Sequence, residues 1–251
     1  MHISVFNLRR GYPVLFFLAL CLFCTGGFFF VRRSYTAYDS AGVLAFAPAD
    51  TAVPKVVILD AGHGGEDVGA TGVSGVFEKD LNLAVTKYVG DYLTAEGYTV
   101  IYTRTDDRLL YTPEENVPGL RKISDLKNRC ALSQKYPGAL FVSIHMNAFG
   151  KPGCRGLQVY YAAGTEGSRA LADAVQGEVR TALQPENHRK IKEGQDIYVL
   201  EHATAPAVLV ECGFISNPEE CASLSDEDYQ KKLGFAIACG ILQYSAETEK
   251  G

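Results

Sequence analysis

The stretch VVILDAGHGGEDVGATGVSGVFE, residues 56–78, decides the fold class. It opens with the apolar run Val56 to Leu59, which is typical of a parallel strand buried on both faces. The loop that follows carries Asp60, His63 and Glu66 among six glycines, which let the backbone fold tightly and approach a ligand closely. Functional side chains of parallel α/β proteins usually lie at the carboxyl ends of strands, so this loop is the first candidate site.

Strand patterns and helix patterns alternate beyond this stretch. Apolar runs predict further strands at residues 98–103, 139–145, 156–161, 197–200 and 207–211. Between them, apolar residues spaced three or four positions apart predict helices. The alternation predicts a single three-layer α/β domain over residues 54–246, with a mixed, mostly parallel sheet of about six strands flanked by helices.

Three of the expected helices have an apolar face suited to packing on the core. The faces are Leu81, Val85, Tyr88 and Tyr92 in the first helix, Leu171, Val175 and Val179 in the helix at 166–183, and Leu233, Ile237, Ile241 and Tyr244 in the last. These residues are therefore the expected helical part of the core.

The composition excludes several functions. The chain of 251 residues is 47% hydrophobic and 21% charged, so it can bury a core and is not disordered. A formal net charge of -5 provides no attraction for nucleic acid, and no nucleotide-binding glycine motif follows a strand. Five of the seven cysteines lie in the domain at irregular spacing, which favours buried free thiols over disulfides or zinc ligands.

Residues 1–33 contain the pattern of a transmembrane helix. Residues 14–31 carry no charge and as a helix would span roughly 27 Å, enough for the core of a bilayer. Pairs of arginines flank both ends, so the positive-inside rule does not settle the orientation. The alternative is a signal peptide cleaved after Ala47, which is disfavoured because the site lies well beyond the apolar run. Residues 34–53 then form a linker, and residues 247–251 a tail.

Two of the five histidines follow buried-strand patterns. His63 lies in the glycine loop, and His145 ends the strand at 139–145. A single histidine there is as readily a hydrogen-bonded structural residue as a ligand. Two of them, with Glu78 at the far end of the same loop, favour a metal site. Two histidines and a glutamate with an open fourth position are typical of catalytic rather than structural zinc.

Glu211 ends another buried strand, directly after the apolar residues 207–210. A carboxylate in this position is unfavourable unless it is paired or functional. A helix cap or a salt bridge remains an alternative, but the three candidate ligands favour a catalytic role for Glu211.

Four motifs occur in order across residues 54–246. They are LDAGHGG at 59–65, FEKDLNL at 77–83, SIHMNA at 143–148 and LVECGFISNPEE at 209–220. With them the chain resembles the zinc-dependent N-acetylmuramoyl-L-alanine amidases of type 3, and most closely their short, membrane-anchored members, including the CwlD-type spore-cortex branch. The resemblance implies that His63, Glu78 and His145 bind one zinc ion and that Glu211 is catalytic. Ala61 stands where the family commonly has proline, which affects no ligand.

The resemblance implies hydrolysis of the amide between N-acetylmuramic acid and L-alanine in peptidoglycan. The catalytic domain would lie outside the cytoplasm, tethered by residues 14–31, and a regulatory protein partner is left open. Asn147, Arg189 and Lys190 are further candidates for substrate contacts.

There are two alternatives to the amidase function. One is a zinc carboxypeptidase acting on stem peptides. It is disfavoured because such enzymes space their first ligands as H-x-x-E, whereas His63 and Glu78 are 15 positions apart. The other is a non-catalytic wall-binding protein on the same fold, which would be expected to lack a ligand or Glu211.

Overall fold

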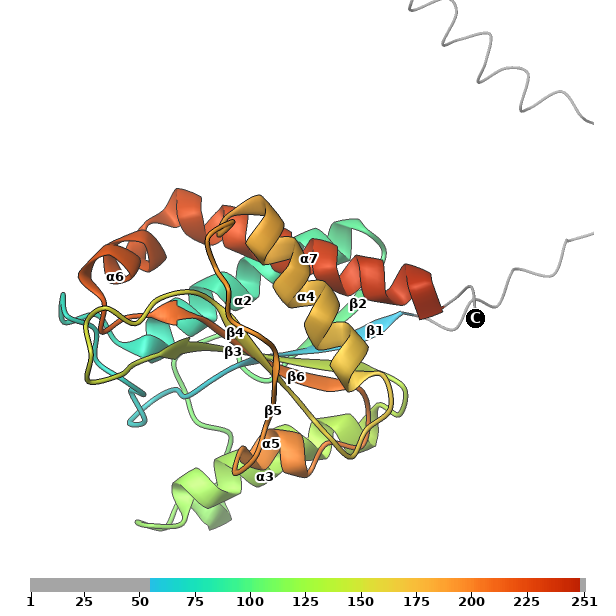
Figure 1. The fold of residues 1–251 in the computed structure, drawn as a ribbon. Helices are drawn as coiled ribbons and strands as arrows, with labels where there is room; N and C mark the ends of the chain where they lie inside the picture. Colours follow the sequence, from blue (N-terminus) through green and yellow to red (C-terminus); the bar gives the residue numbers. More distant parts are fainter. Residues whose placement is uncertain (1–54, 249–251) are drawn as a thin grey trace, which may run out of the picture. The chain divides into compact units, whose positions relative to one another are not determined.

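The computed structural model describes residues 55–248, and a six-stranded sheet forms their centre (Figure 1). The strand order is β2-β1-β3-β6-β4-β5. Four strands run parallel: β1 (Val56–Ala61), β2 (Thr99–Tyr102), β3 (Leu140–Asn147) and β6 (Ala207–Phe214). β4 (Gln158–Tyr161) is antiparallel to β6, and β5 (Lys192–Glu193) runs parallel to β4. The expected mixed, mostly parallel sheet is confirmed.

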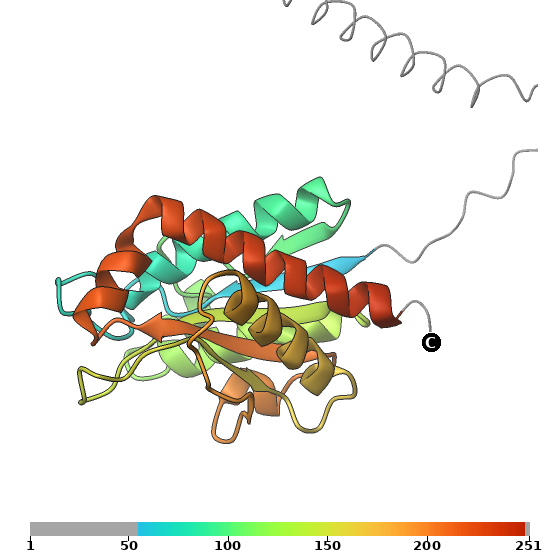
Figure 2. The ribbon, with the colours of Figure 1, turned by 45° about the horizontal axis from the view of Figure 1, so that its top comes forward.

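Helices cover both faces of the sheet. α2 (Glu78–Ala95), α4 (Ser168–Ala182) and α7 (Glu227–Thr248) lie on one face, with α7 packed against both α2 and α4 (Figure 2). α3 (Arg121–Lys135) and the short α5 (Tyr198–Glu201) lie on the other face, and α6 (Pro218–Ser225) leads into α7. A 3-10 turn, η2 (Pro113–Glu115), precedes α3.

The opening strand β1 is buried on both sides. Val57 and Leu59 belong to the core beneath α2, α4 and α7, while Ile58 belongs to the core beneath α3 and α5. All three side chains are fully buried. A strand between two helical layers must be apolar on both faces, which is why its sequence shows no alternation.

The helical core follows the sequence pattern with one correction. The predicted residues of α4 and α7 are all buried. In α2, however, the buried row continues from Leu81 and Val85 to Val89 and Leu93. Tyr88 and Tyr92 instead face α7: the Tyr88 hydroxyl donates to Glu227 at 3.1 Å, and the Tyr92 ring packs on the ring of Phe235. Tyr92 is nevertheless partly buried against the core, so the prediction was wrong at Tyr88, because α2 packs against a helix as well as the sheet.

The strand expected at residues 197–200 is also wrong. These residues enter the helical turn α5, in which the amides of Leu200 and Glu201 donate to the carbonyl of Ile197. A run of four apolar residues does not distinguish a strand from a buried helical turn. The sixth strand is instead β5, two exposed polar residues without an apolar pattern.

The expected membrane segment at 14–31 and the linker lie outside the described residues. Between residues 55 and 248, no helix combines the length and apolar character needed to cross a bilayer. The five cysteines of this part are free thiols, as expected. Cys130, Cys212 and Cys221 are buried, whereas Cys154 and Cys239 are partly exposed.

Candidate metal centre and active site

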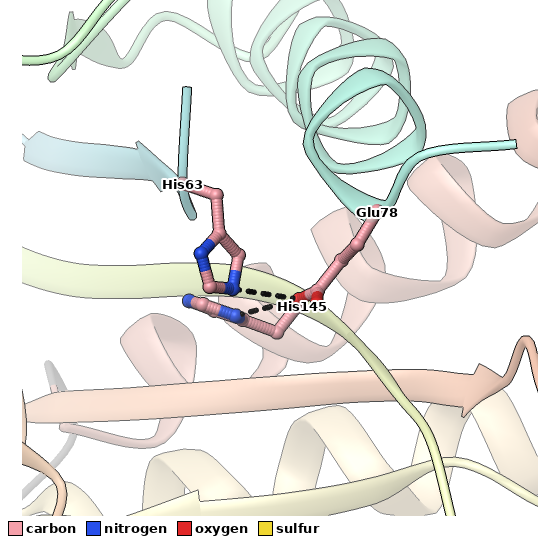
Figure 3. A group of neighbouring side chains, drawn as sticks. All are labelled: His63, Glu78 and His145. Carbon is pink, nitrogen blue, oxygen red and sulfur yellow. Dashed lines mark hydrogen bonds and ion pairs between the residues drawn. The ribbon is translucent and has the colours of Figure 1, made fainter. Parts of the chain in front are cut away.

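His63, Glu78 and His145 converge at the carboxyl ends of β1 and β3, with His145 near the end of β3 and Glu78 at the start of α2 (Figure 3). One possible ligand atom from each lies within 4.8 Å of the others. His63 Nε2 and His145 Nδ1 lie 3.2 Å and 2.9 Å from the same atom, Oε1 of Glu78. The fold therefore brings together the three residues that the sequence predicted as ligands.

The backbone at His63 is held in an uncommon conformation. Its φ of 59° lies in the left-handed region, which residues other than glycine rarely adopt. Arg129 Nη2 donates to the His63 carbonyl at 2.7 Å, and Arg104 Nη2 donates to the Gly62 carbonyl at 2.9 Å. Both guanidiniums also donate to the Ala61 carbonyl. Two buried arginines thus fix the turn that presents His63.

Arg129 is itself held by acids in the core. Its Nη1 donates to Asp60 at 2.5 Å and its Nε to Asp125 at 2.8 Å. Asp60 also accepts hydrogen bonds from the hydroxyls of Thr103 and Ser143. Burial opposes ionisation, but the charge of Arg129 and these hydrogen bonds hold the pKa of Asp60 below its ordinary value. Asp60 is therefore a structural residue, although the sequence places it next to the candidate site.

His63 has a second carboxylate partner. Its Nδ1 lies 2.9 Å from Oδ2 of Asp67, which also lies 3.4 Å from Lys122. Burial lowers the pKa of His63, but the hydrogen bonds to Asp67 and Glu78 outweigh it and raise the pKa to about 9. A metal-binding histidine usually directs its other nitrogen at such a carboxylate, which orients the ring. Glu66, from the same loop, forms an exposed ion pair with Arg121 at 2.6 Å instead.

Glu78 is fixed at the start of α2. Its Oε2 accepts the amide of Ala70 at 2.8 Å, and its Oε1 accepts the amide of Met146 at 3.2 Å and Nδ2 of Asn82 at 3.3 Å. Burial raises the pKa of Glu78, but the hydrogen bonds with His145 and His63 hold it well below its usual range. The carboxylate is therefore ionised and has both oxygens oriented.

The ring of His145 packs directly against Gly62. A Cβ built on Gly62 would overlap atoms of this ring, so only glycine leaves the ring its position. The sequence signal for this contact was the glycine that precedes His63.

Glu211 lies beside the cluster, opposite His145 in the pairing of β3 with β6. The residue is half-buried, and its Oε2 is enclosed without a hydrogen-bond partner among residues 55–248. Burial raises the pKa of Glu211 to about 7, with the nearby His145 opposing the shift and Glu78 adding to it. A carboxylate with such a pKa exchanges protons readily near neutral pH.

The three candidate substrate contacts lie at different places. Asn147 follows a β-bulge after His145 and is half-buried. Arg189 hydrogen-bonds Gln158, which lies opposite Glu211 in the pairing of β4 with β6. The Lys190 side chain is exposed. A cavity of about 870 Å³ lies between the loops at 153–156 and 183–189 and α6, and its lining includes Arg189 but none of the three clustered residues.

Sequence reasoning missed the residues that support the cluster. Asp67, Asn82, Arg104, Arg129 and Gln158 are polar residues in segments read as loop, helix surface or strand. The sequence contained a weak signal for two of these residues, namely their spacing from a predicted ligand. Asp67 follows His63 by four residues, and Asn82 follows Glu78 by four residues on a helix, so the side chains of each pair can contact each other.

The comparisons with known proteins agree with this geometry. The family profile described as N-acetylmuramoyl-L-alanine amidase matches residues 57–243. The chain is similar to the germination-specific N-acetylmuramoyl-L-alanine amidase of Bacillus subtilis (strain 168), with 38% identity over 197 residues, 78% of this chain and 81% of the relative. It is also similar to the uncharacterized protein YqiI of that strain, with 40% identity over 207 residues, 80% of this chain and 92% of the relative.

A solved structure extends the similarity to the fold. The CwlD amidase from Clostridioides difficile, in complex with the GerS lipoprotein, shares 40% identity with a TM-score of 0.74, covering 77% of this chain and 99% of that chain. Sequence and fold are thus similar to those of known amidases over most of the chain, which belongs to the N-acetylmuramoyl-L-alanine amidase family.

Proposed function

We propose that this chain hydrolyses the amide between the lactyl group of N-acetylmuramic acid and L-alanine in peptidoglycan, using one zinc ion held by His63, Glu78 and His145. The observation that carries the proposal is the convergence of these three side chains within 4.8 Å beside Glu211. Two imidazoles and a carboxylate with an open fourth position suit a catalytic zinc. The ion would supply a Lewis acid that polarises the carbonyl and activates water.

Glu211 would act as the general base and then as the general acid. Its unpartnered Oε2 can accept the proton of the attacking water and pass it to the leaving nitrogen of L-alanine. Glu78 is unsuited to this role because its oxygens are already engaged by two backbone amides and by Asn82. The two glutamates would therefore have different roles: Glu78 would bind the ion, and Glu211 would transfer the proton.

Asn147 would contact the substrate rather than orient His145. The ring of His145 is already positioned by its packing on Gly62. The β-bulge between His145 and Asn147 changes the direction of the chain at the edge of the site.

The catalytic domain would act outside the cytoplasm, tethered by residues 14–31. The apolar character of that segment supports this placement, as does a substrate that exists only beyond the membrane. Protease added to intact cells should remove the domain, and protection of the domain would contradict the proposed location.

Similarity to the germination-specific amidase and to CwlD supports a role in the spore cortex. The CwlD amidase was solved in complex with a lipoprotein, which supports a lipoprotein partner for this chain as well.

Mass spectrometry of digested peptidoglycan tests the reaction itself. The amidase reaction releases peptides that begin with L-alanine and leaves glycan with unsubstituted lactyl groups. Loss of terminal D-alanine alone would indicate a carboxypeptidase, and binding without any product would indicate a non-catalytic wall-binding protein.

A further inference from the structure

Arg189 has a fixed guanidinium whose charge is not balanced by an acid. The residue lies in the loop between α4 and β5. Its Nε donates to the Arg155 carbonyl at 2.7 Å, its Nη1 donates to Oε1 of Gln158 at 3.1 Å, and its guanidinium lies 4.5 Å from the centre of the Phe214 ring. All three partners are neutral groups, and within residues 55–248 Arg189 forms no ion pair with a carboxylate.

This guanidinium points to the same face of the sheet as the general base. Gln158 and Glu211 are directly opposite in the antiparallel pair β4 and β6, so their side chains leave the same face. Tyr160, two residues along β4, lies on that face too. Burial raises the pKa of Tyr160, Glu211 raises it further and Arg189 lowers it, so both charges lie near this side chain. Cross-strand Cβ atoms of such a pair lie about 5 Å apart, so Gln158, which accepts a hydrogen bond from Arg189, lies beside Glu211.

The neighbouring cations are not arranged in this way. Arg155 lies 3.4 Å from Glu219 in an exposed ion pair. Lys190 contributes its carbonyl to Gln158 Nε2, while its side chain is exposed. Arg189 is therefore the cation of this loop that is both oriented and unneutralised. A guanidinium held in this way is suited to bind a carboxylate through two parallel hydrogen bonds.

We propose, resting on the amidase function proposed above, that Arg189 binds the free α-carboxylate of the second stem-peptide residue, a D-glutamate linked through its γ-carboxyl. This carboxylate follows the reacting amide by about two residues, a span of roughly 7 Å in an extended peptide. An ion pair of about 3 Å to this carboxylate would place the guanidinium roughly 10 Å from the reacting amide of a peptide bound beside Glu211. Arg189 would thereby set specificity for stem peptides that carry the free acid rather than the carboxamide at this position.

Two synthetic muramyl peptides that differ only in this group, carboxylate or carboxamide, test the proposal with the full-length protein in detergent. Wild type should show a kcat/KM on the order of 10-fold higher for the carboxylate. In Arg189→Gln the ratio of the two kcat/KM values should fall to near one. Arg189→Lys should give an intermediate ratio, because lysine keeps the positive charge but cannot form the two parallel hydrogen bonds of a guanidinium.

Lys192→Gln is the matched control, since it removes one exposed positive charge from the same loop region. It should keep the wild-type ratio. Equal cleavage of both peptides by wild type would overturn the proposal, and so would an equal fall of the ratio in Arg189→Gln and Lys192→Gln. Zinc content and thermal unfolding of each variant should match those of wild type, which shows that the substitution has not disrupted the fold or the metal site.

Failure of the amidase function would look different, because wild type would cleave neither peptide. Calorimetric binding of the two peptides to wild type and Arg189→Gln then decides the role of Arg189. Tighter binding of the carboxylate by wild type alone supports it, and equal binding of both peptides contradicts it.

Discussion

Substitution of Gly62 by alanine should displace the proposed zinc ligand His145 while leaving its side chain chemically unchanged. The new methyl group would overlap Nε2 and Cε1 of His145 and lie 2.7 Å from Cδ2 of the same ring. Gly62 itself cannot yield, because its carbonyl accepts Arg104 Nη2 at 2.9 Å and Asn82 Nδ2 at 3.1 Å. Its amide also donates to the Ile144 carbonyl at 3.1 Å. The ring must therefore move.

The size of the movement determines the size of the effect. Non-bonded carbon atoms lie about 3.5–4.0 Å apart, so the ring must shift by roughly 1.5 Å. A zinc–nitrogen bond of about 2.0–2.1 Å tolerates an error of about 0.2 Å. The proposed ligand is then lost, and we expect the dissociation constant for zinc to rise on the order of 100-fold or more.

A chelator-competition titration of the purified protein measures this change. Gly150→Ala is the control, since a Cβ there meets no atom within 4 Å and the backbone is not left-handed. It should bind zinc as wild type does. If Gly62→Ala also bound zinc with wild-type affinity, the packing of His145 on Gly62 would not position a ligand, and the reasoning would be refuted.

Three further predictions concern the two glutamates, Asp60 and Gly177. Glu211→Gln should keep its zinc and lose activity on the order of 100-fold or more, whereas Glu78→Gln should lose zinc affinity as well. Metal analysis and turnover assays test this. Loss of zinc from Glu211→Gln, with zinc retained in an inactive Glu78→Gln, would show that the two roles are reversed. Asp60→Asn should destabilise the fold by about 1–3 kcal/mol at pH 7, because it leaves Arg129 with one of its two buried acidic partners, Asp125. Because the pKa of Asp60 is lowered in the folded state, its ionised form stabilises the fold above the unfolded pKa near 3.8, and this stabilisation is lost as pH falls below that value. The difference in free energy of unfolding between wild type and Asp60→Asn, measured by urea unfolding, should therefore become smaller in acid. Gly177→Ala, inside α4 with open space around it, should raise stability by about 0.4–1 kcal/mol in the same assay, and a loss would contradict the helix packing.

The fold and the proposed ligands were readable from sequence because they rest on strong local patterns. Apolar runs marked β1, β3 and β6, and His63, His145 and Glu211 stand out at or just beyond the ends of those runs. The two-residue strand β5 has no such pattern, since an edge pairing of exposed residues needs no apolar side chain. The predictions from sequence were correct for segments whose burial requires a run of apolar residues.

The supporting residues were not readable because their burial depends on partners far along the chain. Arg129 sits on a helix of mostly polar residues and is buried only because it meets Asp60 and the carbonyls beyond it, almost 70 positions earlier. Gln158 becomes informative only once β4 is known to lie antiparallel to β6. Such pairings are set by tertiary structure, and single-residue patterns do not report them.

The position of β6 has a consequence for how the protein folds. β6 is the last strand to be synthesised, yet it inserts between β3 and β4 in the middle of the sheet. Before it arrives, β3 and β4 have unpaired edges, and contacts of such long sequence separation form slowly. The strand that closes this gap is also the one that delivers Glu211 to the side of His145. A nascent or truncated chain that ends before residue 207 therefore has an incomplete sheet, lacks the proposed general base and would lack the proposed hydrolytic activity.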